Sequence, residues 1–73
     1  MKNRIIFVCV HNAGRSQMAK AFFNNLVSIN SNWYADSAGT EPSDNINSIV
    51  VQALDELSID ISTEKPRELD FNT

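Results

Sequence analysis

One eight-residue segment constrains this chain more than any other: Cys-Val-His-Asn-Ala-Gly-Arg-Ser at positions 9–16. It follows an apolar run, Ile-Ile-Phe-Val at 5–8, and precedes a helical pattern that begins near Gln17. The apolar run predicts a parallel strand buried on both faces, because it shows no polar alternation. Cys9 is therefore expected where this strand ends, and Arg15 is expected at the N-terminus of the following helix.

A tight loop between a strand and a helix gathers backbone N–H groups that bind anions. The positive helix end and the Arg15 guanidinium both favour a thiolate at Cys9. Arg15 can form hydrogen bonds with two oxygens of a tetrahedral oxyanion. The alternative is that Arg15 is only a charged surface residue. We expect the Ser16 hydroxyl to donate to the thiolate. The predicted catalytic residues are Cys9, Arg15 and Ser16, and the predicted oxyanion-binding residues are Val10, His11, Asn12, Ala13, Gly14 and Arg15.

Several of these residues also have a plainer interpretation. Cys9 could be a small buried hydrophobic residue. Ser16 could be a helix N-cap, a role compatible with orienting the thiolate. His11 either offers only its backbone N–H or tunes the thiolate. Asn12 is expected to brace the loop through its side chain, and both Asn12 and Gly14 tolerate the left-handed backbone angles that such a loop needs.

The pattern Cys-x5-Arg-Ser between a strand and a helix resembles the phosphate loop of the low-molecular-weight protein tyrosine phosphatase superfamily. The longer segment Cys-Val-His-Asn-Ala-Gly-Arg-Ser-Gln-Met-Ala at 9–19 is most similar to the arsenate reductase branch. The phosphatases usually have a glycine at the position of His11 and a second cysteine at that of Gly14. Ser-Ala-Gly-Thr at 37–40 extends the resemblance, and it either helps to wall the site or forms a generic turn. The resemblance runs over the whole chain, which covers about the first half of the family's domain.

Apolar spacing also predicts the order of elements. Residues 4–9 and 33–38 indicate two strands joined by a helix over 17–29, which is a βαβ unit. A second helix is expected from Ser43 or Asp44, as its N-cap, to about Leu57, and residues 65–70 are expected to form a turn or a short helix. The expected core residues are Met18, Ala19, Phe22, Phe23, Leu26, Val27 and Ile29 of the first helix, and Ile46, Ile49, Val50, Ala53, Leu54 and Leu57 of the second.

The fold class is therefore α/β, and the resemblance makes residues 1–73 a single partial domain, the beginning of a three-layer fold with a parallel sheet. One cysteine excludes an intramolecular disulfide, and Cys9 with His11 is a poor metal site, so no metal or bound cofactor is expected. The net charge of −3 comes with no basic stripe for nucleic acid. No segment approaches the ~20 apolar residues of a membrane span. A working thiol suits a reducing cytoplasm.

The resemblance implies an arsenate reductase in which the Cys9 thiolate attacks arsenate held by the loop and Arg15. A second thiol, from a small molecule or a redoxin, then releases arsenite. Two alternatives stay open: a phosphomonoesterase that acts through a phosphocysteine, and a truncated oxyanion-binding fragment without catalysis. No aspartate precedes a proline here, so the family's general acid loop is not within these residues. In the family a third strand flanks the first one, so we expect self-association or a completing chain at that edge.

Overall fold

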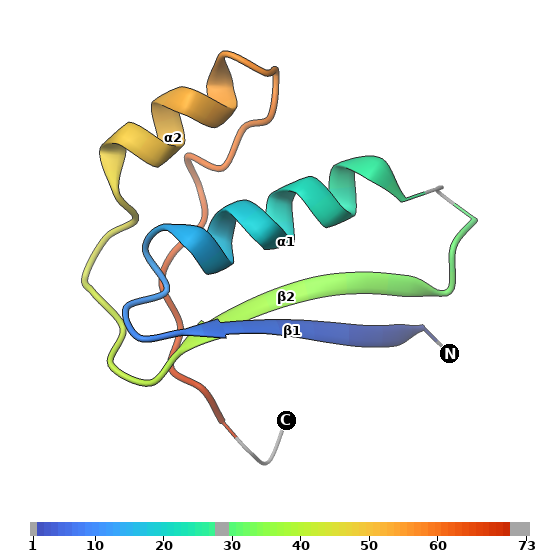
Figure 1. Cartoon of the computed structure of the whole chain (residues 1–73), viewed down its shortest axis with the longest axis horizontal. Coiled ribbons are helices and arrows are strands. Elements are labelled where there is room, and N and C mark those ends of the chain that lie inside the picture. Colours follow the sequence, from blue (N-terminus) through green and yellow to red (C-terminus); the bar gives the residue numbers. More distant parts are fainter. Residues whose placement is uncertain (1, 28–29, 71–73) are drawn as a thin grey trace.

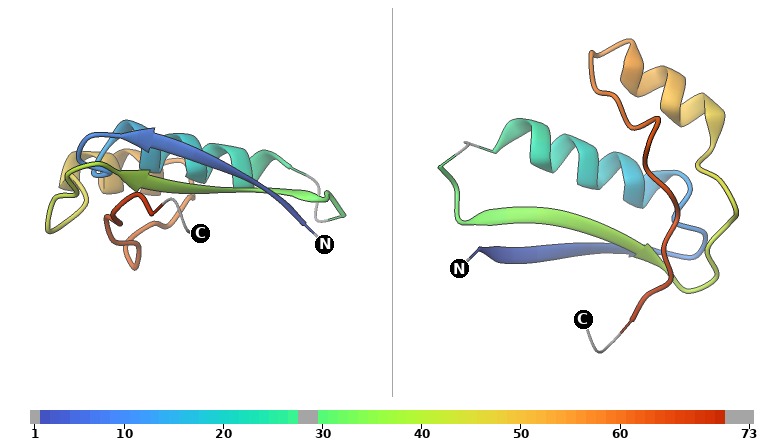
Figure 2. Two further views of the ribbon diagram at one scale, coloured as in Figure 1. Left: turned by 90° about the horizontal axis from the view of Figure 1, so that it is seen from below. Right: turned by 180° about the vertical axis from the view of Figure 1, so that it is seen from behind.

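The computed structural model describes residues 2–27 and 30–70. Figure 1 shows its elements in the order β1 (Asn3–Cys9), α1 (Arg15–Leu26), β2 (Trp33–Gly39) and α2 (Ser48–Asp55). β1 and β2 pair in parallel along their whole length, which places Cys9 opposite Gly39. α1 lies over one face of this sheet, as the views in Figure 2 show. The predicted α/β class and βαβ unit are confirmed.

The strands agree closely with the prediction, while α1 is shifted toward the N-terminus. β1 begins one residue earlier than predicted and β2 ends one residue later. α1 starts at Arg15, which places Arg15 and Ser16 in the first turn of the helix. It ends at Leu26, because Val27 turns to extended backbone with φ −73° and ψ 150°. The predicted last residue, Ile29, lies outside the described residues.

The predicted start of α2 is wrong. The helix starts at Ser48 rather than next to Ser43 or Asp44, and its N-cap is Asn47. The Asn47 side-chain oxygen accepts a 2.8 Å hydrogen bond from the Ile49 N–H, as an N-cap should. Several backbone N–H groups of residues 40–47 donate instead to the loop after β1, so this segment is held in a non-helical conformation.

The outer edge of β2 is covered by other parts of the chain. Residues 65–70, predicted as a turn or a short helix, are instead extended where they pass the C-terminal end of β2, and there Glu68 forms a parallel bridge with Gly39. The N–H groups that β2 directs to this edge, at residues 33, 35, 37 and 39, each donate to an acceptor in the chain. The pairs are Trp33 to Ser31 Oγ at 3.0 Å, Ala35 to Asn24 Oδ1 at 2.7 Å, Ser37 to Asp36 Oδ1 at 3.0 Å and Gly39 to Arg67 O at 2.7 Å.

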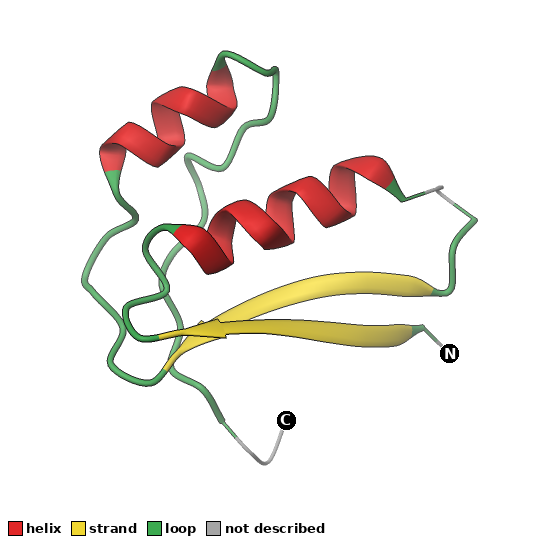
Figure 3. Ribbon diagram, in the orientation of Figure 1, coloured by secondary structure: helices red, strands yellow, loops and turns green. Residues whose placement is uncertain are grey.

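β1, in contrast, has one open edge. Among the described residues β1 pairs with β2 alone, as the two strands in Figure 3 show. An unpaired strand edge presents backbone donors and acceptors that another strand can bind. This edge is the one at which self-association or a completing chain is expected from the sequence.

The core is smaller than the apolar pattern predicted. Phe23 of α1 packs against Phe7 of β1 in an edge-to-face contact, with ring centroids 6.4 Å apart. The prediction that β1 is buried on both faces is wrong, since Val8 is 50% exposed. A sheet of two strands is too narrow to cover the whole apolar stripe of α1. The fully buried apolar residues are Ala35, Ala38, Leu54 and Ile61, while Phe22, Leu26, Ile49 and Leu57 of the predicted core are exposed.

Candidate active site

The loop between β1 and α1 contains one residue in the left-handed region. Asn12 has φ 51°, a conformation that asparagine tolerates better than most residues, as predicted. The same expectation for Gly14 is wrong, because its φ is −136°. A Cβ atom added at Gly14 would meet no heavy atom within 4 Å. The left-handed backbone angle of the loop is therefore at Asn12 and not at Gly14.

Every carbonyl of residues 9–13 accepts a hydrogen bond from outside the loop. The donors are Thr40 N to Cys9 O at 3.1 Å, Glu41 N to Val10 O at 2.7 Å, Ser43 N to His11 O at 2.9 Å, Gln17 Nε2 to Asn12 O at 3.1 Å and Asn47 N to Ala13 O at 2.8 Å. All of the described peptide bonds are trans, so each N–H points away from the preceding carbonyl. The N–H groups of residues 10–14 thus point away from these partners, which leaves them on the opposite side of the loop backbone, as an anion nest requires.

The sulfur of Cys9 has two close hydrogen-bonding partners. The Asn12 N–H donates to Sγ over 3.1 Å, and the Ser16 Oγ lies 2.8 Å from Sγ. Ser16 Oγ also accepts a 2.7 Å hydrogen bond from the side-chain Nδ2 of Asn12. Because Nδ2 only donates and a thiolate only accepts, the Ser16 hydroxyl is the donor to the sulfur when Cys9 is ionised. The predicted contact between Ser16 and Cys9 is therefore present.

These contacts decide the pKa of Cys9. Partial burial by itself raises this pKa, but the Ser16 hydroxyl and the backbone N–H groups of Asn12, Ser16 and His11 lower it below the ordinary value of 9.0. The predicted direction is thus confirmed, although its sources differ from the prediction. The helix end contributes through the Ser16 N–H, whereas Arg15 is not among the groups that lower the pKa. A lower pKa increases the fraction of thiolate, which is the nucleophilic form.

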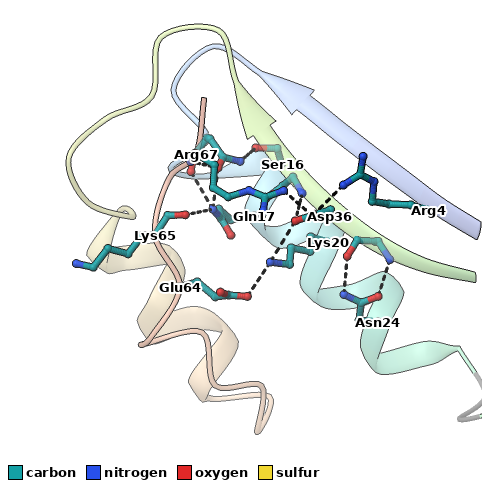
Figure 4. A network of polar contacts seen from close by, with 12 residues as sticks. Arg4, Ser16, Gln17, Lys20, Asn24, Asp36, Glu64, Lys65 and Arg67 are labelled. Carbon is teal, nitrogen blue, oxygen red and sulfur yellow. Dashed lines mark hydrogen bonds and ion pairs between the residues drawn. The ribbon is translucent and has the colours of Figure 1, made fainter. Parts of the chain in front are cut away.

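Asn12 holds this arrangement from inside the protein. Its side chain is fully buried, and its Oδ1 accepts hydrogen bonds from Gln17 Nε2 at 3.0 Å and from the Arg67 N–H at 2.8 Å. Gln17 is also buried, at 2% exposure, and lies beside Ser16 and Arg67 in Figure 4. The predicted bracing role of Asn12 is confirmed. Sequence reasoning missed both of its partners: a polar residue inside the apolar helical pattern was a signal for Gln17, and no local pattern pointed to Arg67.

A pocket of about 410 Å³ opens beside the Cys9 sulfur. Arg15 lines this pocket, and no described residue forms a hydrogen bond or an ion pair with its guanidinium, which leaves it available to a ligand. The His11 ring bonds the Glu41 carbonyl through Nδ1 at 3.1 Å, so its side chain helps to fix the loop. Asn47 was missed, although an N-cap residue type before a helix is a usable signal. The lining residues are Cys9, Val10, His11, Ala13, Gly14, Arg15 and Asn47.

Gly39 and Thr40 stand directly behind the loop. The Thr40 N–H donates to the Cys9 carbonyl. A Cβ atom added at Gly39 would lie 2.6 Å from the Val10 carbonyl oxygen and 3.0 Å from Asn12 N and Cβ. Such distances are too short for any side chain, so the close approach of the loop requires glycine here. Residues 37–40 are not among those that line the pocket beside Cys9, so they do not wall the site, and Gly39 and Thr40 contact the loop from behind instead.

Two further properties concern the described residues as a whole. Across residues 2–27 and 30–70, no cluster of three or more His, Cys, Asp or Glu side chains could hold a metal ion. In that same part of the chain, no helix has both the length and the apolar character needed to cross a membrane.

Comparisons with known proteins agree with this loop and fold. The sequence model described as low molecular weight phosphotyrosine protein phosphatase matches residues 4–72. An arsenate reductase of Bacillus cereus is 35% identical over 71 residues, which are 97% of this chain and 51% of that protein. The chain spans about half the length of the curated relatives it matches.

Solved structures give the same result. A thioredoxin-dependent arsenate reductase of Corynebacterium glutamicum aligns with a TM-score of 0.82 at 36% identity, covering 94% of this chain and 35% of that chain. A low-molecular-weight protein tyrosine phosphatase from T. tengcongensis aligns with a TM-score of 0.83 at 34% identity, covering 94% of this chain and 50% of that chain. With a family match over nearly its whole length, the chain belongs to the low-molecular-weight phosphotyrosine protein phosphatase family.

Proposed function

We propose that this chain carries the nucleophile and the oxyanion loop of an arsenate reductase. The observation that carries the proposal is the environment of Cys9: a thiol of lowered pKa, held by the Ser16 hydroxyl and loop N–H groups, next to a pocket lined by Arg15. In the bound state, the N–H groups of Val10, His11, Asn12, Ala13 and Gly14 donate to the oxyanion, and Arg15 binds two of its oxygens. Arsenate is favoured as substrate because named arsenate reductases are among the relatives.

The proposed reaction has two steps. The Cys9 thiolate attacks arsenate, so that a sulfur–arsenic bond forms and one oxygen leaves as water. An external thiolate then attacks the Cys9 sulfur. A disulfide forms, the sulfur–arsenic bond breaks, and its electron pair reduces As(V) to As(III), which leaves as arsenite. A second external thiol reduces the disulfide. Since Cys9 is the single cysteine in these 73 residues, we assign both reducing thiols to a small-molecule thiol or a redoxin.

The second candidate is a phosphomonoesterase that acts through a phosphocysteine. It is supported by the description of the family and by the structural likeness to a tyrosine phosphatase. An alkoxide leaving group needs a proton from a positioned acid, and no described carboxyl group lines the pocket beside Cys9. We therefore expect slow turnover of p-nitrophenyl phosphate and none of alkyl phosphates. A third candidate, an oxyanion-binding fragment without catalysis, would bind arsenate and phosphate without turnover of either.

The test is the formation of arsenite. The chain is incubated with arsenate and glutathione, or with thioredoxin, thioredoxin reductase and NADPH, and arsenite is measured by chromatography coupled to elemental detection. We expect arsenite to form with the wild-type chain and not with Cys9→Ser. Hydrolysis of p-nitrophenyl phosphate without arsenite would favour the esterase, and binding of arsenate without either product would favour the fragment.

We also propose, from the same reasoning, that residues 1–73 form one part of a larger domain in a reducing compartment such as the cytoplasm. The open edge of β1 would then bind a strand from a completing chain or from a second copy. A free thiolate nucleophile persists only where thiols stay reduced, which supports the compartment.

A further inference from the structure

Arg67 connects the loop to a part of the chain that is remote in sequence. Its backbone N–H donates to Asn12 Oδ1 at 2.8 Å, and its carbonyl accepts the Gly39 N–H at 2.7 Å. Its guanidinium pairs with the carboxylate of Asp36 on β2 (Figure 4). One residue therefore contacts the sheet through its side chain and the catalytic loop through its backbone.

The Arg67 N–H has a specific effect on Asn12. A carboxamide can turn either its oxygen or its NH₂ group toward a neighbour. Because the Arg67 N–H and the Gln17 Nε2 both donate, only the oxygen of Asn12 can face them. The NH₂ group must then face Ser16 Oγ, so the Ser16 hydroxyl donates to Cys9 once the sulfur is a thiolate. The hydrogen bonds then run in one direction, from residue 67 to the thiolate, and they stabilise its ionised form.

Asp36 is placed to hold Arg67. The Asp36 side chain is 16% exposed, and its carboxylate also lies 3.7 Å from Lys20 Nζ and 3.9 Å from Arg4 Nη1. Its burial raises its pKa, but the Ser37 N–H and the charges of Arg67 and Lys20 lower the pKa overall. Asp36 is therefore ionised near neutral pH, where it attracts the Arg67 guanidinium.

We propose that Asp36 and Arg67 are positioning residues for Cys9: their ion pair fixes the Arg67 backbone against the loop, and the Arg67 N–H aligns Asn12 and Ser16 on the Cys9 sulfur. Neither residue touches a bound oxyanion. The inference rests on the proposed function only in taking Cys9 as the nucleophile, and it concerns the thiol before any substrate binds.

The experiment measures the rate of Cys9 alkylation by iodoacetamide from pH 4 to 10 in the 73-residue chain. Asp36→Asn and Arg67→Gln should each raise the pKa of Cys9 and, at pH values below that pKa, slow alkylation by about three- to tenfold, as a rise of ~0.5–1 unit predicts. Arg67→Lys keeps the charge and should restore part of the rate. Glu64→Gln is the matched control: it removes the negative charge that pairs with Lys20 at 2.8 Å in the same network, at a residue that does not contact Arg67, and it should leave the profile unchanged.

A double-mutant cycle tests the route. If the pair acts through Ser16, Asp36→Asn should produce no further shift in a Ser16→Ala chain, because the last link to the sulfur is already gone. An unchanged pKa in Asp36→Asn, or an equal shift with and without Ser16, would overturn the proposal. If Asp36→Asn loses the near-ultraviolet circular dichroism signal of the folded chain, the pKa of Cys9 is compared between Arg67→Gln and Arg67→Lys instead. Equal pKa values in these two variants and the wild-type chain would overturn the proposal. Alkylation needs no arsenate, so a failure to form arsenite would refute the proposed function and leave this inference standing.

Discussion

Gly39→Ala is the substitution that most directly tests how the loop is supported. The new methyl group would lie 2.6 Å from the Val10 carbonyl oxygen and 3.0 Å from Asn12 Cβ and N, whereas ordinary contact begins near 3.4 Å. Two of these three atoms are backbone, so the loop itself must move. Overpacking of this kind costs about 1–3 kcal/mol. For a domain of this size that corresponds to a fall in Tm of roughly 4–24 °C.

The displacement of the loop in Gly39→Ala should also change the reactivity of Cys9. Asn12 would be displaced from Cys9 and Ser16, so the pKa of Cys9 should rise and its alkylation at pH 6 should slow. Urea denaturation followed by Trp33 fluorescence gives the free energy of unfolding, and iodoacetamide alkylation gives the pKa. Gly14→Ala is the control, because a methyl group there meets no atom within 4 Å and should cost less. Equal stability and equal reactivity of Gly39→Ala and the wild-type chain would refute the argument.

Three other substitutions test separate parts of the structure. Arg15→Lys should weaken arsenate binding in calorimetry, because an ammonium cannot form the bidentate hydrogen bonds of a guanidinium. Equal affinities of the variant and the wild-type chain would exclude Arg15 as the residue that binds the oxyanion. Asp36 has a lowered pKa in the folded state, so it stabilises the fold above its ordinary pKa of ~3.9 and this stabilisation is lost as pH falls through the lowered value. The stability of Asp36→Asn should therefore fall less steeply below pH 4 in urea titrations, and an identical slope would contradict this. Val8→Pro removes one N–H from the open edge of β1, and it should reduce self-association in sedimentation velocity; unchanged association would place the contact elsewhere.

The sequence predicts the strands and α1 well because their signals are local. An apolar run without polar alternation and a helical stripe depend on neighbours within a few positions. The contact of Ser16 with Cys9 was predictable for the same reason, since the short loop of residues 10–14 brings the first turn of α1 back to the end of β1.

The errors have a different origin. Ser43 is a good N-cap type, but its N–H is used by the His11 carbonyl, and the helix can start only after Asn47. Leu26 fits an apolar stripe, yet the sheet beneath α1 has two strands and leaves it 79% exposed. The bond from Arg67 to Asn12 spans 55 positions, and no periodicity within one element can reveal it. Tertiary contacts overrode the local preference in each case.

The reactivity of Cys9 should therefore depend on segments that follow the predicted catalytic residues. Residues 40–47 donate to the carbonyls of Cys9, Val10, His11 and Ala13. Residue 67 supplies one of the two donors that orient Asn12. A peptide of residues 1–30 contains every predicted site residue but lacks all of these donors. Its thiol should titrate near the free-cysteine pKa of ~8.5, whereas the 73-residue chain should titrate lower. Equal values in the two, measured by alkylation, would mean that residues 9–16 organise their own loop and that the later segments support the fold alone.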